Sequence, residues 1–301
     1  MALAEAAGLP FQVKHLAARA PWRWLPPQLW AFPLAGVAVR EGPLAPPWPR
    51  LVVSCGRITV APALAVKARG GAATFAVHVQ DPQAGRARFD LVVAGAHDAL
   101  TGPNVVTVEG ALHRVTPARL AQAAAAAGPA LTALPRPRVA VLLGGANRAF
   151  RLGPVQAARL GEEVAAMAAA AGGSVLATPS RRTGEAATAA FARAVAAVPH
   201  VVWDGRGPNP YLAILALADA IVVTEDSISM ACEAAATGRP VLVAALPGGS
   251  AKFRRFHARM AAVGATRAFQ GRLEAWSHAA PDEAARVGAL VRARLAGGGA
   301  A

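Results

Sequence analysis

The sequence of 301 residues has only two cysteines, Cys55 and Cys232. They lie far apart and lack the spacing of a metal site or a disulfide framework, so we expect two buried thiols in a reducing compartment. The sequence also has no P-loop, no Gly-x-Gly-x-x-Gly fingerprint and no Asp-x-Asp pair. The missing P-loop and glycine fingerprint argue against a kinase and a dehydrogenase, and we expect neither a metal ion nor a cofactor.

Long apolar runs are missing too, although 54 % of the residues are hydrophobic and the mean hydropathy is +0.36. The segment 211–223 comes nearest, but it is too short for a bilayer and contains Asp219. Much of the apolar content is alanine, which favours helices rather than lipid contact. No basic residue precedes Lys14, unlike in a secretory signal. We therefore expect a cytoplasmic protein.

Acidic residues are few: 17 stand against 31 basic ones, which gives a net charge of +14. The excess is spread along the chain and forms no basic patch with interleaved aromatics, so we do not expect nucleic acid as a partner. Such a field still attracts nucleotide diphosphates and anionic lipid surfaces.

Tryptophan is concentrated near the start of the chain. Four tryptophans lie among prolines and arginines: Trp22, Trp24, Trp30 and Trp48. A segment of this kind either packs against a sheet or rests at a membrane interface. Peripheral contact with an anionic membrane, at its inner face, is therefore one hypothesis.

Short β-branched runs alternate with helical segments in both halves of the chain. The expected strands are 51–54, 74–80, 90–94, 105–108, 139–143, 174–178, 200–203, 220–224 and 240–244. This rhythm predicts two α/β domains, each with a doubly wound parallel sheet. We place them at residues 1–130 and 131–301, with a linker over 128–138 and a terminal helix over 281–295. Ligands of such folds bind outside the carboxyl ends of the strands.

Residues 221–243 say most about function. A β-branched run ends at Asp226 and Ser227, which are N-cap residue types, and a helical stretch then continues to Gly238. The first backbone N–H groups of that helix favour an anion. Ser229 and Glu233 share one helix face, and the Glu233 carboxylate is expected to lean toward the helix start. This pattern suits a nucleotide, with diphosphate at Asp226–Met230 and ribose at Glu233; an ordinary capped helix with a solvated glutamate is the alternative.

Three further loops follow predicted strands of the second half. Gly144, Gly145 and Asn147 form a glycine turn through which a backbone can approach a phosphate. Arg181 or Arg182 offers a bidentate fork for phosphate oxygens. Trp203 either contacts a base or packs internally. The alternatives are an ordinary turn and two solvated arginines.

Polar residues also follow the strands of the first half. His97, Asp98 and Asp81 are candidate bases for deprotonating an acceptor hydroxyl. Loop caps and hydrogen-bond anchors are the alternative roles.

Segments along nearly the whole chain resemble the family named after the plant mitochondrial-fission protein "elongated mitochondria". They include Ala20–Pro27, Ser54–Arg57, Val77–Pro82, Phe89–Val93, His97–Asp98, Gly110–His113, Leu143–Gly145, Pro179–Thr183, Asp226–Met230 and Lys252–His257. Residues 203–243 also resemble the donor domain of GT-B glycosyltransferases, where a helical glutamate binds ribose.

The resemblance implies a GT-B-like fold and metal-independent transfer of a sugar from a nucleotide-diphosphate sugar to a glycan or lipid-linked acceptor, such as one of the cell envelope. It leaves two alternatives: a non-catalytic adaptor, and a nucleotide-sugar epimerase or hydrolase. Residues 1–10 resemble the end of the family's first helix, so we expect the N-terminal sheet to lack its first strand.

Overall fold

The computed structural model describes residues 1–297 and divides the chain into two compact units. Unit 1 comprises Met1–Leu112 together with the C-terminal helix that begins at Glu283, and unit 2 comprises His113–Asp282. The boundary predicted at residues 130 and 131 therefore lies inside unit 2. The terminal helix, predicted within the second domain, belongs to unit 1.

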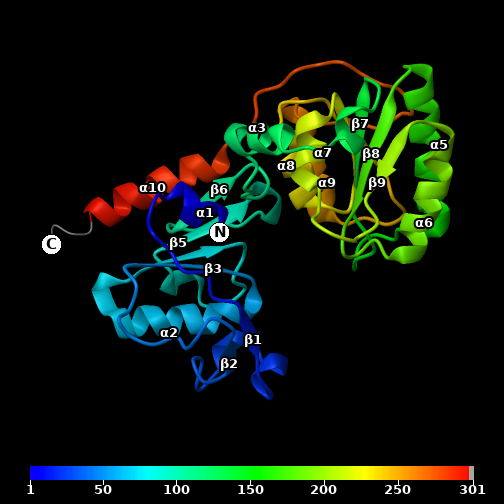
Figure 1. Ribbon diagram of the computed structural model, residues 1–301. Helices are drawn as coiled ribbons and strands as arrows, with labels where there is room; N and C mark the ends of the chain where they lie inside the picture. The colour runs from blue at the N-terminus through cyan, green and yellow to red at the C-terminus, as the bar shows by residue number, and fades with distance from the viewer. Residues whose placement is uncertain (298–301) are drawn as a thin grey trace. The chain divides into compact units, whose positions relative to one another are not determined.

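Unit 1 is built on a parallel sheet of four strands in chain order, coloured cyan to green in Figure 1. The strands are β3 (Leu51–Cys55), β4 (Phe75–Val79), β5 (Leu91–Gly95) and β6 (Val105–Val108). Alternate residues face opposite sides, so Ala76 packs under α2 (Val60–Gly70) while Val77 faces α1 (Ala2–Ala6) and α10 (Glu283–Gly297). The predicted strands of this half are thus confirmed to within two residues.

Helices α1 and α10 cover one face of this sheet together. Leu3 of α1 and Val287 and Val291 of α10 are buried among the sheet valines. The helices approach closely at Gly288, where an added Cβ would lie 2.5 Å from the backbone oxygen of Ala6. Helix α1 is the first element of the described chain, and the expectation of a lost first strand stays a prediction.

A two-stranded antiparallel ribbon, which was not predicted, precedes this sheet. It pairs β1 (Leu16–Ala18) with β2 (Val37–Val39), and two short 3₁₀ turns lie between them, η1 (Trp22–Trp24) and η2 (Pro27–Leu29). Trp30 is buried against Val37 and Ala61, whereas Trp24 is 65 % exposed. In the tryptophan-rich segment Trp30 and Trp22 therefore pack, whereas Trp24 does not.

Unit 2 is built on a parallel sheet of six strands in the order β12-β11-β10-β7-β8-β9. These strands are β7 (Arg138–Leu143), β8 (Ser174–Pro179), β9 (His200–Val202), β10 (Ala220–Thr224), β11 (Val241–Ala244) and β12 (Arg267–Ala268). From β7 the chain moves outward through β8 and β9, then returns to build β10, β11 and β12 on the other side of β7. The order reverses between β7 and β10, which makes their carboxyl ends the topological switch point.

The helices of unit 2 lie on both faces of its sheet, as the green and yellow ribbons of Figure 1 show. They are α3 (Pro117–Ala125), α4 (Pro129–Thr132), α5 (Pro154–Ala170), α6 (Glu185–Ala194), α7 (Tyr211–Leu217), α8 (Ile228–Ala235) and α9 (Ala251–Ala262). One core joins α5 and α6 to the valines of β7 and β8, with Phe191 and Val164 fully buried. The predicted linker contains α4 and the first residue of β7.

The structure also bears on the cysteines and on the apolar content of the chain. Cys232 is buried, as expected, but Cys55 is exposed, because it ends an edge strand at the carboxyl side of the sheet. Among the residues that the structure describes, no helix combines the length and the apolar character needed to span a bilayer.

Candidate functional site

The loops after β7 and β10 are joined directly at the switch point of unit 2. The Gly144 N–H donates to Thr224 Oγ1 at 2.8 Å, and the Gly145 N–H donates to Asp226 Oδ2 at 2.9 Å. The Asp226 side chain is fully buried, with 0 % of it exposed. The Gly145 N–H, predicted to approach a phosphate, therefore donates to a carboxylate of the protein itself.

The two glycines are required by this close approach. A Cβ at Gly144 would lie 2.0 Å from Asp226 Oδ1, and one at Gly145 would lie 2.2 Å from the backbone of Arg182. Neither position has room for a side chain, so the glycine pair fixes how three loops meet.

The loop after β8 completes this cluster. The hydroxyls of Ser180 and Thr183 donate to the Gly144 carbonyl, and Arg182 Nη2 lies 3.1 Å from Asp226 Oδ2. The guanidinium offsets the buried negative charge of Asp226, because an unpaired buried carboxylate is costly. The structure thus brings together four predicted residues: Gly144, Gly145, Arg182 and Asp226.

Helix α8 begins beside this cluster. Ser227 caps it by accepting a hydrogen bond from the Met230 N–H at 3.4 Å. The backbone N–H groups of Ile228 and Ser229 have no acceptor within residues 1–297, and Ser229 is exposed. Open amides at a helix start carry partial positive charge and form a site for an anion.

Glu233 lies one turn further along α8 and is half-buried. It accepts a short hydrogen bond from the Tyr211 hydroxyl at the start of α7. Since α7 follows β9, its first residue lies on the carboxyl side of the sheet, and so does the Glu233 carboxylate. Burial raises the pKa of Glu233 above the usual carboxyl value, while the Tyr211 hydrogen bond opposes that shift.

Tyr211 was not among the predicted site residues. It is the only tyrosine of the chain and lies in the Asn209-Pro210-Tyr211 segment that resembles GT-B donor domains. Its pKa is raised well above the usual value, chiefly by burial and then by the Glu233 charge. The resemblance of this segment could have marked Tyr211 as a candidate, but nothing in the sequence indicated that its hydroxyl binds Glu233.

Two other predicted residues form hydrogen bonds to backbone groups. Asn147 Oδ1 accepts the Ala149 and Phe150 N–H groups, and its Nδ2 donates to the Asp226 backbone oxygen at 3.3 Å. The Trp203 indole donates to the Arg206 oxygen at 2.9 Å. Both side chains shape their loops.

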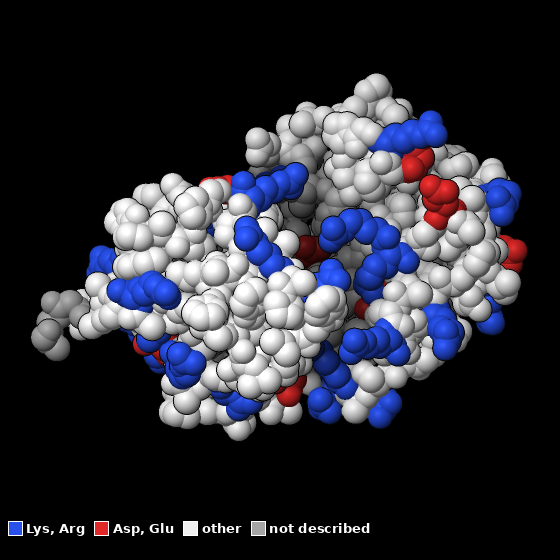
Figure 2. Space-filling model, turned by 90° about the horizontal axis from the view of Figure 1, so that it is seen from below, with Lys and Arg blue, Asp and Glu red and all other residues white. Residues whose placement is uncertain are grey.

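The carboxyl side of the unit 2 sheet is basic. Exposed arginines without a side-chain partner in the described chain include Arg148 after β7, Arg181 after β8 and Arg254 on α9. On the face shown in Figure 2, basic side chains (blue) are more numerous than acidic ones (red). This charge favours an anionic ligand. The described residues hold no cluster of metal-ligating side chains large enough for an ion.

The base candidates of unit 1 follow two neighbouring strands. His97 is buried after β5, and its Nε2 lies 3.7 Å from Asp98 Oδ2. Asp81 follows β4, and its Oδ1 accepts the Gln83 N–H at 2.8 Å. Positive φ angles of non-glycine residues, in the described chain, occur only at Gln80, Gln83 and Ala99 in these same loops. Backbone strain of this kind concentrates at functional sites.

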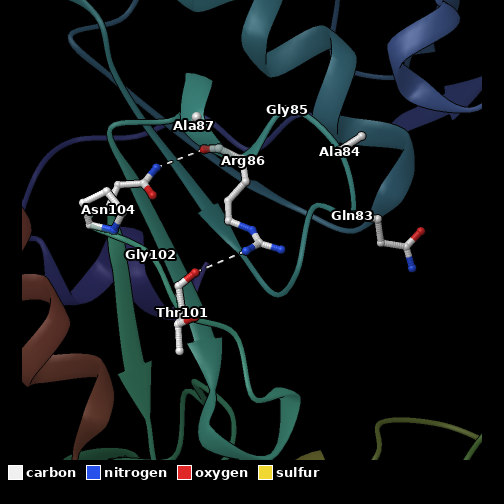
Figure 3. A pocket seen from close by; sticks show the side chains of 9 residues that line it. Gln83, Ala84, Gly85, Arg86, Ala87, Thr101, Gly102 and Asn104 are labelled. Atoms are coloured by element: carbon white, nitrogen blue, oxygen red, sulfur yellow. Dashed lines mark hydrogen bonds between the residues drawn. The ribbon is translucent and has the colours of Figure 1, made fainter.

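A shallow hollow of about 440 Å³ lies near Asp81, between the β4–β5 and β5–β6 connections. In Figure 3, Arg86 donates to the Thr101 oxygen at 3.2 Å, and Asn104 donates to the Arg86 oxygen at 2.9 Å. These hydrogen bonds join the two connections, while Arg86 Nε is buried without a partner in the described chain.

These features define a class: a protein of two parallel α/β units with a Rossmann-like, GT-B-like fold. The UDP-GlcNAc 2-epimerase of Methanocaldococcus jannaschii shares this fold, with a TM-score of 0.52 and 13 % identity over 81 % of this chain and 77 % of that one. Acinetobacter baumannii MurG matches with a TM-score of 0.42 and 15 % identity over 81 % of this chain and 64 % of that one.

Sequence comparison gives the family. The model of the mitochondrial fission ELM1 family matches residues 1–295. The mitochondrial fission protein ELM1 of Arabidopsis thaliana is 31 % identical over 287 residues, which cover 86 % of this chain and 66 % of the plant protein. The chain belongs to the mitochondrial fission ELM1 family.

Proposed function

We propose that unit 2 binds a nucleotide-diphosphate sugar at its switch point, and that the protein transfers the sugar to a glycan or lipid-linked acceptor. One observation carries the proposal. The N–H groups of Ile228 and Ser229 have no acceptor within residues 1–297, and they lie one turn before the Glu233 carboxylate, which Tyr211 hydrogen-bonds. A diphosphate suits the amides, and a ribose suits the carboxylate, because hydroxyls donate and carboxylates accept.

The transfer needs no metal ion in this proposal. The acceptor oxygen attacks the anomeric carbon, the bond to the diphosphate oxygen breaks, and the acceptor proton passes to a base. The helix dipole of α8 and the unpaired Arg181 stabilise the departing diphosphate. We assign acceptor binding to unit 1, with His97, Asp98 or Asp81 as the base.

A thermal-shift panel of nucleoside diphosphates tests the binding step. We expect at least one to raise the melting temperature of the wild-type chain, because ligands that bind only the folded state stabilise it. Glu233→Ala should lose this shift, whereas Glu162→Ala, which replaces an exposed glutamate of α5, should keep it. A chain that no nucleotide stabilises refutes the proposal and favours a non-catalytic adaptor. Sugar release without an acceptor favours a hydrolase or epimerase.

A second proposal concerns the segment between β1 and β2: it docks on an anionic lipid surface. Trp24, Leu29 and Phe32 are 65 %, 60 % and 67 % exposed. The Arg23 guanidinium stacks on the Trp24 ring at 4.2 Å, and Arg57 braces the segment by donating to the Leu25 oxygen. Exposed aromatics beside arginines combine apolar insertion with attraction to lipid phosphate.

Vesicle sedimentation tests this surface. Wild type should pellet with vesicles of phosphatidylglycerol and phosphatidylcholine but not with phosphatidylcholine alone. Replacing Trp24, Leu29 and Phe32 by serine should abolish pelleting. The matched control replaces Val155 and Val263 of unit 2, which are 76 % and 54 % exposed, by serine. Equal pelleting of both variants would refute docking through this segment.

A further inference from the structure

We infer that Tyr211 is a positioning residue that orients Glu233 and thereby selects ribose over deoxyribose; the inference rests on the proposed nucleotide binding. The Tyr211 hydroxyl donates to Glu233 Oε2, and this bond joins the first turn of α7 to the middle of α8. The bond joins Glu233, which was predicted to bind ribose, to Tyr211, for which no role was predicted.

The position of Tyr211 is itself fixed. Its backbone N–H donates to Asn209 Oδ1 at 3.0 Å, and the same oxygen lies 3.5 Å from Thr178 Oγ1 at the end of β8. The ring is therefore anchored to the sheet through the loop that follows β9. A hydroxyl held from a strand end orients a carboxylate more narrowly than solvent does.

This hydrogen bond leaves one carboxylate oxygen for a ligand. Glu233 Oε1 has no partner within residues 1–297, and the side chain is only half-buried. A ribose diol presents two O–H donors to such an acceptor, whereas a 2′-deoxyribose presents one. A site built to accept hydroxyls discriminates against analogues that lack them.

The same bond controls protonation. Burial raises the pKa of Glu233, and the Tyr211 hydroxyl lowers it again. The ionised carboxylate accepts on both oxygens, from the tyrosine and from the ribose, whereas protonation turns one oxygen into a donor. Because the pKa of Tyr211 is raised well above its usual value, the hydroxyl remains a donor throughout the neutral range. Loss of the hydroxyl should therefore move the acid limit of binding to higher pH.

The single tyrosine allows a readout without ligand. Labelling the full chain with ¹³Cζ-tyrosine gives one signal, since the sequence contains only Tyr211. We expect this signal to titrate in acid with the ionisation of Glu233, and Glu233→Gln to abolish that titration. A signal that titrates identically in Glu233→Gln would overturn the pairing, whatever the protein binds.

Tyr211→Phe tests selection. Pairs of ribo- and 2′-deoxyribonucleoside diphosphates are titrated calorimetrically from pH 5 to 8. The variant should lose roughly tenfold in ribonucleotide affinity and little in deoxyribonucleotide affinity, as expected for one lost hydrogen bond to a charged group, with its acid limit shifted upward.

The outcomes separate the two claims. A variant with the wild-type ribose preference and the wild-type pH profile would show that Tyr211 only packs, and would leave the proposed function intact. A wild-type chain that binds no nucleotide would overturn both.

Discussion

Glycine and aspartate form the centre of the switch point at the scale of single residues. The sequence indicated that a group approaches closely at Gly144 and Gly145, because glycine removes side-chain obstruction. It did not indicate that the groups are the Asp226 carboxylate at Gly144 and the Arg182 backbone at Gly145, nor that the Gly145 N–H binds Asp226, 81 residues away. A contact over that separation depends on the strand order, which periodicity does not give.

A double-mutant cycle tests the glycine–carboxylate contact. Gly144→Ala should destabilise the protein by about 1–3 kcal/mol, because its Cβ overlaps the Asp226 carboxylate. Asp226→Ala removes that overlap, so the two costs should not add. Urea unfolding of wild type, both single variants and the double variant measures the coupling. Strict additivity would contradict this packing.

A buried histidine makes unit 1 sensitive to acid. His78 is 0 % exposed, its Nδ1 lies 2.8 Å from Ser54 Oγ, and burial lowers its pKa to about 4. The unfolded chain takes up this proton at about pH 6.5, so the stability from neutral His78 is complete above that pH. It is then lost as the pH falls toward 4.

The free energy of unfolding should fall by about 3 kcal/mol on acidification, from the difference between the two pKa values of His78. Urea unfolding at pH 7 and pH 4.5 measures it. His78→Leu should show a much smaller pH dependence over this range. If His78→Leu keeps the wild-type pH dependence of stability, another group causes the acid sensitivity.

At the scale of elements, the long periodic segments were predictable and the short ones were not. All nine predicted strands exist because each is a run of mainly apolar residues, and the central strands β5, β7 and β10 are buried on both faces. The strands β1, β2 and β12 contain only two or three residues and were missed; β9 is as short, but it lies within the alternation of strands and helices. The packing of α1 against α10 could not be predicted either, because it joins the two ends of the chain.

Helix α10 offers a test in which packing opposes helix propensity. Alanine is favoured over glycine in a helix by about 1 kcal/mol. Gly288→Ala should nevertheless destabilise the protein, because the new Cβ would lie 2.5 Å from the Ala6 oxygen. Gly297→Ala is the matched control in the same helix, with no atom near its added Cβ. Thermal unfolding that shows both variants equally stable would contradict the α1–α10 contact.

At the scale of the whole molecule, the sequence predicted two parallel α/β units and the family, and both are confirmed. The contacts divide the chain between Leu112 and His113, not at residues 130 and 131, and they return the chain to unit 1 at Glu283. Composition marks a linker only where contacts are few, and residues 128–138 instead contain α4 and the start of β7. The site residues of both units stay predictions, although the structure gathers those of unit 2 around one sheet edge.

A crystal structure of the full chain with a ribonucleoside diphosphate tests the central claim most directly. The account predicts diphosphate density at the amides of Ile228 and Ser229, with the ribose hydroxyls on the Glu233 oxygen that Tyr211 leaves open. Density for the nucleotide elsewhere, or a Glu233 carboxylate without ribose contact, would contradict it.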